Sequence, residues 1–589
     1  MVLTQITPFA KGQDQQQAEI EARKLIERLG NHPLAIQSAI GSINESSRKL
    51  VHWNKRANTE QILSSEHHNS FRYAPYPKGL REAFASRVEG LDDSSRLLLD
   101  VLSTLDPDQI PEQLIDQASP AEDLGTIDFV ADLDHCVSQV SKGLIVRGVR
   151  RETGNPSNES VKDRTSFYMH RLLRDFVHSR MSDKGRQAAF ETASKLLSLA
   201  IDTRNHPQGE SVNAVKYRVT LDQEYTSMYL LHIRSLHEFY EGCCKQHGKN
   251  LRVPIHFLRM LVRSSWLCYR AGYLKVGLEL VSTAIEIRRG AERKVISIIN
   301  GTDAEAAKVW QRLYYNHACI KTETGDFQTA LESFSEYKSL CDSSGDFTTK
   351  DAWRAIGGIA NSEQGLGNHE EAIRCYKKCI QLQARPKDVV YSPYEVNICR
   401  SYWALNKNDL ASERLEELLR LRLKELGAES DVNGYHDYIY GHMNYVLGNV
   451  RIAQGRMEEA YSCHKIALSC WRKKMGENHH KTGDAWHKVG WHLFRRHEIE
   501  EARIHLKTAL KVYRAGFDEG FRQAEIARTT HLLGLVEALT GSSAGSESRR
   551  LIQEAEAMRK ALMGKRENDR DTVSVTQATY DDLVSLWAR

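Results

Sequence analysis

The amino-acid sequence predicts a mostly α-helical protein in which a head with a small β-hairpin precedes a solenoid of repeated helix pairs. Three observations support this fold class. Only 12 of the 589 residues are proline, and long stretches rich in helix-forming residues lack the alternation typical of a strand. A helix-turn-helix pattern recurs with a spacing of 42 residues. Two short β-rich runs, separated by a polar loop, precede these repeats.

The composition excludes several classes of function. Hydrophobic residues make up 41% of the chain and charged residues 27%, as in a folded soluble protein. The net charge of +4, from 81 Lys and Arg against 77 Asp and Glu, gives no nucleic-acid-binding surface unless basic residues cluster. No apolar window could span a membrane and the first residues lack signal-peptide order, so we expect a cytoplasmic or nuclear protein. The 11 cysteines are expected to be reduced thiols.

The chain is too long for one compact core, since a domain has roughly 150 residues. Near the start, Gln17–Gly30 predicts a helix that stops at Gly30, and Pro33 is placed to begin another helix. The predicted order is a helical segment with its linker at 1–70, a winged-helix domain at 71–210, connecting helices at 211–254, a solenoid at 255–562 and a tail or capping helix at 563–589.

The winged-helix prediction depends on the runs Gly143–Val149 and Thr165–His170. Both are β-rich, they follow two or three predicted helices, and a polar loop separates them, as in the hairpin of a winged helix. Basic residues gather around this hairpin at Arg147, Arg150, Arg151, Lys162 and Arg164. A DNA-binding regulator is therefore one alternative function, although the near-neutral total charge argues against it.

The solenoid prediction depends on a turn residue followed five positions later by Ala. The four clear turn residues are Gly325, Gly367, Gly455 and His497. Seven positions before each turn stands a small residue that would let two helices approach closely, namely Ala318, Ala360, Gly448 and Gly490. Weaker copies begin at Phe257, Tyr394 and Ala524, which gives about seven units.

The run Trp486–Leu510, WHKVGWHLFRRHEIEEARIHLKTAL, resembles a tetratricopeptide repeat at its Trp, small, Ala and Ala positions. In this register, we expect Gly448 to face Ala460 in one helix pair and Gly490 to face Ala502 in the next. The resemblance implies an α-solenoid.

The linker Lys473–Thr482 and the 42-residue spacing resemble the longer repeats of the kinesin light chain group. That group usually has a His-Pro pair where this chain has His479 and His480. We expect these two histidines to be solvated, because they belong to a polar linker.

The head resembles the second half of the NB-ARC module of STAND nucleotide-switch proteins, particularly fungal ones in which it precedes tetratricopeptide repeats. Gly30–Ile36 looks like the family's Gly-Leu-Pro-Leu motif and Met169–Asp175 like its Met-His-Asp motif, which implies that Pro33 would contact adenine and His170 a phosphate. A working switch also needs a Gly-rich phosphate loop ending in Lys-Ser/Thr, and the nearest string, Gly242–Asn250, ends in Asn. We therefore expect no cofactor, while the alternative is the C-terminal part of a nucleotide-regulated STAND ATPase.

The first helices of the repeats are expected to line a protein-binding groove. Its predicted residues are Tyr315, His442, Tyr445, Asn449, His487, Trp491, Phe494 and Arg495. Chaperone-binding relatives hold acidic tails with Lys and Asn at set positions, and here Asn449 and Asn361 match whereas Tyr445 and Gly357 replace Lys. We therefore do not expect a chaperone-tail adaptor, and the alternative for the aromatic residues is packing between repeats.

No motif for a catalytic nucleophile or a metal site occurs in the sequence. The sequence therefore favours a non-enzymatic scaffold or adaptor that binds a peptide or helix of a partner protein, with no metal and no cofactor.

Overall fold

The computed structural model places most of the chain in two compact units. The first comprises 1–207, 227–260 and 296–300, and the second comprises 208–226, 261–295 and 301–589. The described residues are 22–23, 84–85, 87–116, 132–142, 144–150, 164–202, 228–244, 251–343, 349–382, 393–426, 438–515, 522–540, 544–563 and 576–589. The predicted motif Gly30–Ile36, with Pro33, lies outside them.

The first unit contains a three-stranded antiparallel sheet next to helices. Strands β2 (Ile145–Arg150) and β3 (Arg164–Met169) form the predicted hairpin, with Ile145 opposite Met169 and Arg150 opposite Arg164. A third strand that the sequence analysis missed, β1 (Ile110–Pro111), pairs with the other edge of β3. The hairpin prediction is therefore confirmed, and the sheet is one strand larger than expected.

The core of the first unit forms around one amphipathic helix. Helix α6 (Asp93–Thr104) begins at Asp92, whose carboxylate accepts a hydrogen bond from the backbone N–H of Ser95 at 2.8 Å. Its apolar face is buried and contacts three other helices, which are α8 (Leu133–Ser141), α9 (Arg171–Arg180) and α10 (Asp183–Asp202). The unit also contains the helical residues 228–244 and three short elements, namely α7 (Gln113–Asp116), β4 (Val253–Pro254) and β5 (Ile298–Ile299). Strands β4 and β5 pair in parallel.

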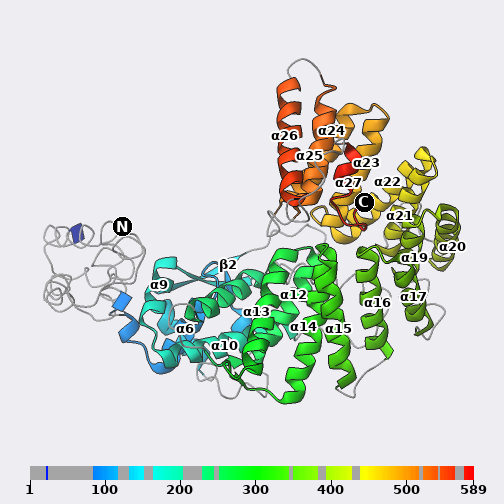
Figure 1. The fold of residues 1–589 in the computed structure, drawn as a ribbon. Helices are drawn as coiled ribbons and strands as arrows, with labels where there is room; N and C mark the ends of the chain where they lie inside the picture. The colour runs from blue at the N-terminus through cyan, green and yellow to red at the C-terminus, as the bar shows by residue number, and fades with distance from the viewer. Residues whose placement is uncertain are drawn as a thin grey trace. The chain divides into compact units, whose positions relative to one another are not determined.

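Seven consecutive helix pairs follow between Ile255 and Met563 (Figure 1). The pairs are α12 (Ile255–Ala271) with α13 (Leu274–Glu292), α14 (Asp303–Glu323) with α15 (Phe327–Ser343), α16 (Thr349–Gly365) with α17 (His369–Leu382), α19 (Pro393–Ala404) with α20 (Asn408–Leu426), α21 (Tyr438–Ala453) with α22 (Met457–Met475), α23 (His480–Arg495) with α24 (Ile499–Arg514), and α25 (Gln523–Glu537) with α26 (Ala544–Met563). From α13 to α26, each described helix contacts the next. The solenoid is therefore confirmed.

A residue with left-handed backbone stands between the helices of most pairs. The positive φ angles are 83° at Gly272, 79° at Gly325, 88° at Gly367, 58° at Asn406, 74° at Gly455 and 59° at His497. Glycine adopts this conformation without steric cost, and it ends a helix there. The four turn residues predicted from the sequence are all in this set, so the predicted repeat register is confirmed.

Small residues allow the two helices of a pair to approach, but the partners differ from those expected. Ala460 and Ala502 are fully buried. A Cβ atom on Gly448 would meet the His464 ring at 2.5 Å, and one on Gly490 would meet Leu506 at 2.9 Å. The space beside each glycine is thus taken by a large side chain one helical turn beyond the alanine.

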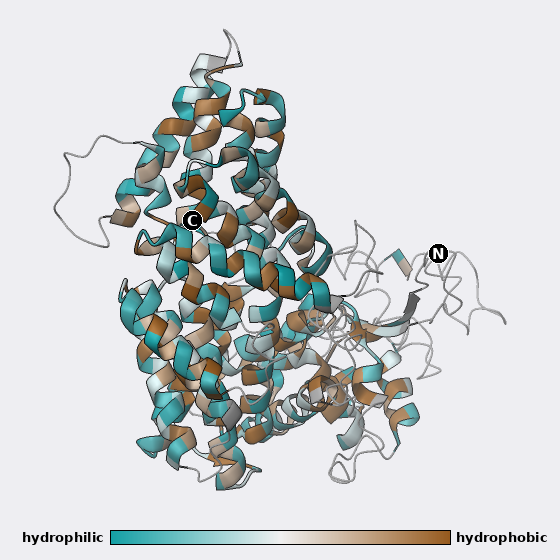
Figure 2. Cartoon of the chain, turned by 90° about the vertical axis from the view of Figure 1, so that its right-hand side faces the viewer, coloured by the Kyte–Doolittle hydropathy of each residue, from teal (hydrophilic) through white to brown (hydrophobic). Residues whose placement is uncertain are grey.

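Hydrophilic and hydrophobic residues both occur on the helices that Figure 2 shows. The apolar side chains form several buried clusters, one of which joins α21 to α26 through Trp471, Leu506 and Tyr513. Among the described residues, no helix is both long enough and apolar enough to cross a membrane.

Candidate functional site

The first helices of three of the last four pairs carry polar side chains that contact the final segment of the chain, 576–589. We call Arg400, Tyr445, Asn449 and Arg528 the docking face. These residues come from α19, α21 and α25. Arg400 and Asn449 each stand six residues before the left-handed residue of their own repeat, so the repeat geometry directs both to the same side of the array.

The docking face binds the main chain of the segment. Tyr445 donates from its hydroxyl to the carbonyl oxygen of Ala588 at 3.0 Å, and Arg528 donates from Nη1 to the same oxygen at 2.7 Å. Asn449 donates from Nδ2 to the carbonyl oxygen of Arg589 at 2.7 Å. Because carbonyl groups are common to all residues, these three bonds recognise a peptide backbone and not a particular side chain.

One aromatic side chain of the segment lies against a buried cation. The guanidinium of Arg400 is 5.1 Å from the centre of the Trp587 ring, a cation–π geometry. Arg400 also donates to Asn397 Oδ1 at 2.6 Å and to His442 Nε2. Since Nε2 of His442 accepts, this histidine is neutral, and burial together with the Arg400 charge holds its pKa well below the usual value.

The other end of the segment packs on the last helix pair. Helix α27 (Gln577–Asp581) carries Tyr580, which stacks on His531 with ring centres 4.2 Å apart and donates to Glu556 Oε2 at 3.2 Å. Tyr580 and Leu583 belong to a buried cluster with Ala527 and Ala555. The segment is thus anchored at two places, Tyr580 with Leu583 and Trp587 with Ala588.

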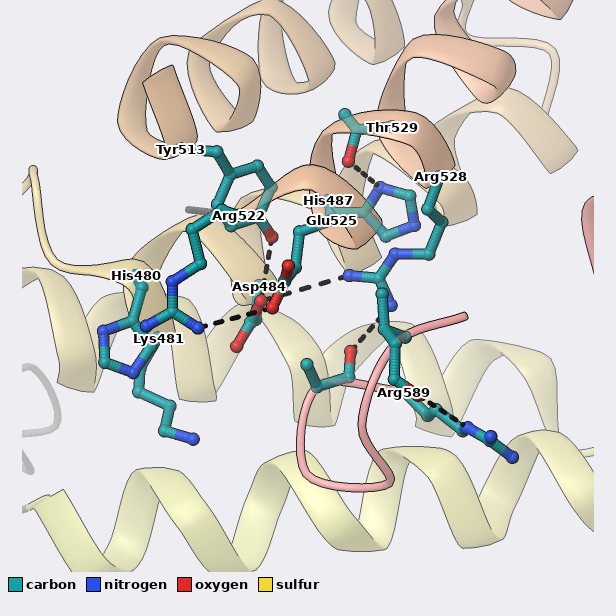
Figure 3. A network of polar contacts seen from close by, with 12 residues as sticks. His480, Lys481, Asp484, His487, Tyr513, Arg522, Glu525, Arg528, Thr529 and Arg589 are labelled. Carbon is teal, nitrogen blue, oxygen red and sulfur yellow. Dashed lines mark hydrogen bonds and ion pairs between the residues drawn. The ribbon is translucent and has the colours of Figure 1, made fainter. Parts of the chain in front are cut away.

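A buried network of charges lies behind the docking face (Figure 3). Asp484 Oδ1 accepts from the hydroxyl of Tyr513 at 2.8 Å and is 4.0 Å from Nη2 of Arg528. Burial raises the pKa of Asp484 to about 6, although Lys481 and Arg528 act in the opposite direction. Burial lowers the pKa of Lys488 to about 8, which the carboxylate of Asp581 in the segment opposes. The segment therefore contributes charge as well as contacts.

A second charged cluster joins helices from repeats that are not neighbours in sequence. Nζ of Lys481 in α23 is 3.1 Å from Oε2 of Glu323 in α14, and Nε2 of His480 is 3.5 Å from the same oxygen. The rings of His479 and His480 stack with centres 4.3 Å apart. A Cβ atom on Gly272, in the first turn of the solenoid, would be 3.2 Å from His480 Nδ1.

The prediction that His479 and His480 are solvated is therefore wrong. Both are buried, and burial lowers the pKa of His479 to about 3 and that of His480 well below its usual value. His479 still acts as expected of a linker residue in one respect, because its Nδ1 accepts from the backbone N–H of Lys481 at 3.2 Å at the start of α23.

Three of the eight predicted groove residues lie at or beside the docking face. Tyr445 and Asn449 contact the segment directly, and His442 does so through Arg400. His487 lies behind them, buried and bonded through Nδ1 to the Thr529 hydroxyl at 3.0 Å.

The remaining four predicted residues lie elsewhere. Trp491 and Phe494 are half-buried against the cluster that joins α21 to α26, and the exposed Arg495 lies 5.2 Å above the Trp491 ring. Tyr315 contacts Trp266, Phe334 and Tyr337. Sequence reasoning missed Arg400 and Arg528, although Arg400 holds the same position in its repeat as Asn449 and Trp491.

The head positions His170 at the junction between β3 and α9. Its Nδ1 accepts from the backbone N–H of Leu172 at 3.2 Å, so the ring caps the helix. The proposed basic hairpin is partly neutralised, because Arg147 Nη2 is 2.7 Å from Glu112 Oε1.

All eleven cysteines lie in the described part of the chain, and none of them forms a disulfide there. Across the same residues, no three His, Cys, Asp or Glu side chains are arranged to hold a metal ion.

Two stretches of the chain match the sequence profile of the tetratricopeptide repeat, residues 354–386 and 441–515. No curated protein sequence matches significantly. Similar solved structures include a Podosopora anserina kinesin light chain with nearly identical TPR-like repeats, which is 16% identical over 36% of this chain and 96% of its own, with a TM-score of 0.28.

Two further structures cover more of the chain. The STAND protein PH0952 of Pyrococcus horikoshii, which has a tetratricopeptide repeat sensor, is 13% identical over 90% of this chain and 73% of its own, with a TM-score of 0.32. NprR in complex with its cognate peptide NprX is 12% identical over 62% of this chain and 96% of its own, with a TM-score of 0.38. Residues 354–386 and 441–515 are thus tetratricopeptide repeats, a module that indicates a protein–protein interaction scaffold.

Proposed function

We propose that the chain is a non-enzymatic adaptor that holds an extended segment of a partner protein along the first helices of its repeats. One observation carries the proposal: Tyr445, Asn449 and Arg528 direct hydrogen-bond donors at successive backbone carbonyls. Donors from different repeats that converge on a main chain are suited to peptide recognition, in which backbone bonds supply affinity and side-chain pockets supply selectivity.

Burial supports the same proposal. Tyr445 and Asn449 are buried, and Arg528 is fully buried. A buried donor without an acceptor costs about 1 to 3 kcal/mol, and more when it is charged. A face with three such donors is stable when a peptide, or water in its place, supplies the acceptors. The docking face is therefore suited to binding a peptide.

For the head, we propose a STAND-like origin. The hairpin β2–β3 and the position of His170 between a strand and a helix support this proposal. His170 uses Nδ1 to cap α9. In this proposal the head has a structural or regulatory role, and the repeats bind the partner protein.

Site-specific photo-crosslinking tests the adaptor function. A benzophenone amino acid replaces Trp491, which shares the repeat position of Arg400 and Asn449, or Ile504, which is 60% exposed on the second helix of the same pair. Irradiation of living cells should link a partner protein to the chain labelled at 491 and not at 504. Adducts at 504 alone, or at neither position, contradict the proposal.

Replacing Trp491 and Phe494 by alanine is a weaker test. Both side chains pack against the cluster that joins α21 to α26, so the double variant should also lose thermal stability. Loss of partner capture counts only if circular dichroism shows that the variant is folded at the temperature of the experiment.

A further inference from the structure

We infer that residues 576–589 are a built-in ligand of the docking face, and that the segment of the external partner carries the same anchors and displaces them. The anchors are a tyrosine, an apolar pair three and four residues later, and an aromatic residue followed by a small one, as in Tyr580, Leu583–Val584 and Trp587–Ala588. This inference rests on the proposed function, since it names the ligand of that face.

The contacts of the segment are those of a bound peptide. Two of its carbonyl groups accept three hydrogen bonds from the docking face, and Trp587 covers the cation of Arg400. Twelve residues, 564–575, separate the segment from the end of α26. A short tether of this kind gives a local concentration that is roughly millimolar, so an untethered ligand competes at a disadvantage.

The docked state also contains features that favour exchange. Arg400 and Arg528 are 2% and 0% exposed, and removing cations from water is costly. The nearest carboxylate to Arg528, that of Asp484, is 4.0 Å away. When the segment leaves, water reaches both guanidinium groups and part of that cost is recovered. A competitor therefore replaces a ligand of moderate strength and not an integral part of the core.

The docking face recognises the aromatic residue at position 587 through its ring, which lies against Arg400. Trp587 presents its face to Arg400, whereas its indole N–H has no acceptor among the described residues. A phenylalanine at this position would keep the cation–π contact without burying an unsatisfied donor. The partner is thus expected to carry either aromatic residue there, while alanine would remove the contact.

The test uses the full-length chain and a synthetic peptide of residues 576–589 with a fluorophore at its first residue. Fluorescence anisotropy measures binding of this peptide to the wild-type chain and to the variant Trp587→Ala. Weakening the tethered segment frees the face, so the peptide should bind the variant at least tenfold more tightly than the wild type. The matched control is Ala578→Ser, at an exposed position of the same segment, and it should leave the affinity unchanged.

The same substitution in the peptide should have the opposite effect. On the Trp587→Ala chain, a peptide with alanine at position 587 should bind at least tenfold more weakly than the wild-type peptide, and a peptide with phenylalanine there should bind as well. Absence of peptide binding to the Trp587→Ala chain overturns the inference, as does equal affinity for both chains. Loss of circular dichroism in that variant also overturns it, because the segment would then be part of the core.

Two controls separate this inference from others. Sedimentation of the wild-type chain should show a monomer, whereas a dimer that dissociates in Trp587→Ala would mean that the segment docks on a second copy, which contradicts a built-in ligand. Crosslinking from position 491 does not involve the peptide. If a partner is captured there but the peptide never binds, the inference fails and the proposed function stands.

Discussion

Lys481 and Glu323 depend on each other for their charged states. Burial alone would raise the pKa of Glu323, but Lys481 and His480 outweigh it and hold that pKa well below its usual value. Burial would lower the pKa of Lys481, and Glu323 raises it instead. We expect Lys481→Met to cost about 3 to 5 kcal/mol of unfolding free energy, because it leaves a buried carboxylate without its main partner.

Adding Glu323→Gln to Lys481→Met should restore most of that loss, since neither charge is then buried. Urea unfolding of the wild type, both single variants and the double variant gives the coupling energy. A loss below about 1 kcal/mol in Lys481→Met would show that the pair behaves like a surface ion pair.

His170 should act as a helix cap and not as a nucleotide ligand. His170→Ala should lower the stability of the head by about 1 kcal/mol, because the N–H of Leu172 loses its acceptor, and His170→Asn should retain most of it. Calorimetric titration should show no ADP affinity tighter than about millimolar, since one ring and no phosphate loop offer little binding energy. Micromolar ADP binding that disappears in His170→Ala would instead support a nucleotide switch.

For single residues, the sequence predicts the secondary structure in which a residue lies more reliably than it predicts whether the side chain is buried. His479 and His480 occur between polar residues in the sequence, and the turn at Gly272 and the end of α14 help to bury them. Those elements lie more than 150 residues earlier, beyond the reach of any local pattern. Tyr445 and Asn449 could be placed on the first helix of their pair from the sequence, because the repeat spacing alone determines that position.

At the scale of a helix pair, close approach at Gly490 should be the sensitive point. Gly490→Leu should cost about 1 to 3 kcal/mol, because a Cβ atom there already meets Leu506 at 2.9 Å. Ala502→Leu should cost a similar amount, since Ala502 is fully buried. If both variants had the same midpoint of thermal unfolding as the wild type, this packing would be contradicted.

The turn glycines give the matched comparison. A Cβ atom on Gly455 would meet no atom within 4 Å, so Gly455→Ala tests backbone conformation alone at a φ of 74°. Its cost should be about 1 kcal/mol, which separates backbone strain from the overpacking at Gly490.

Helices and strands could be predicted from the sequence where a residue pattern recurs at a regular spacing. The hairpin, the helix pairs and their turn residues follow from alternation, spacing and glycine. Strand β1 was missed because two residues carry no periodicity, and the segment 576–589 was expected only as a tail or cap. Its role depends on Trp587, which contacts Arg400, and on two main-chain oxygens, which accept from Tyr445, Arg528 and Asn449. The spacing of residues within the segment does not predict these contacts.

At the scale of the whole chain, buried histidines should make the solenoid sensitive to acid. Burial lowers the pKa values of several histidines in the repeats, including the six residues His442, His464, His479, His480, His487 and His492. The unfolded chain binds protons below about pH 6.5 that the folded chain does not, so stability falls as the pH falls. Each histidine contributes about 1.4 kcal/mol per pH unit.

Asp484 opposes this trend, because its pKa of about 6 lets the folded chain take up one proton first as the pH falls toward 4. Six histidines outweigh one carboxyl, so the urea midpoint should drop steeply between pH 7 and pH 5.5. The variant His479→Gln with His480→Gln, compared with its own value at pH 7.5, should show a shallower drop. A midpoint that is constant over this range would mean that the histidines are accessible to protons in the folded chain.

The contact between Glu323 and Lys481 also limits how the array can change in evolution. Repeat proteins commonly gain or lose units, because each unit touches only its neighbours. Here an inserted or deleted pair between α14 and α23 would move Lys481 and His480 away from Glu323 and leave a buried carboxylate alone. The number of repeats between α14 and α23 is therefore fixed. Repeats can be added without leaving Glu323 unpaired only before α14 or after α23.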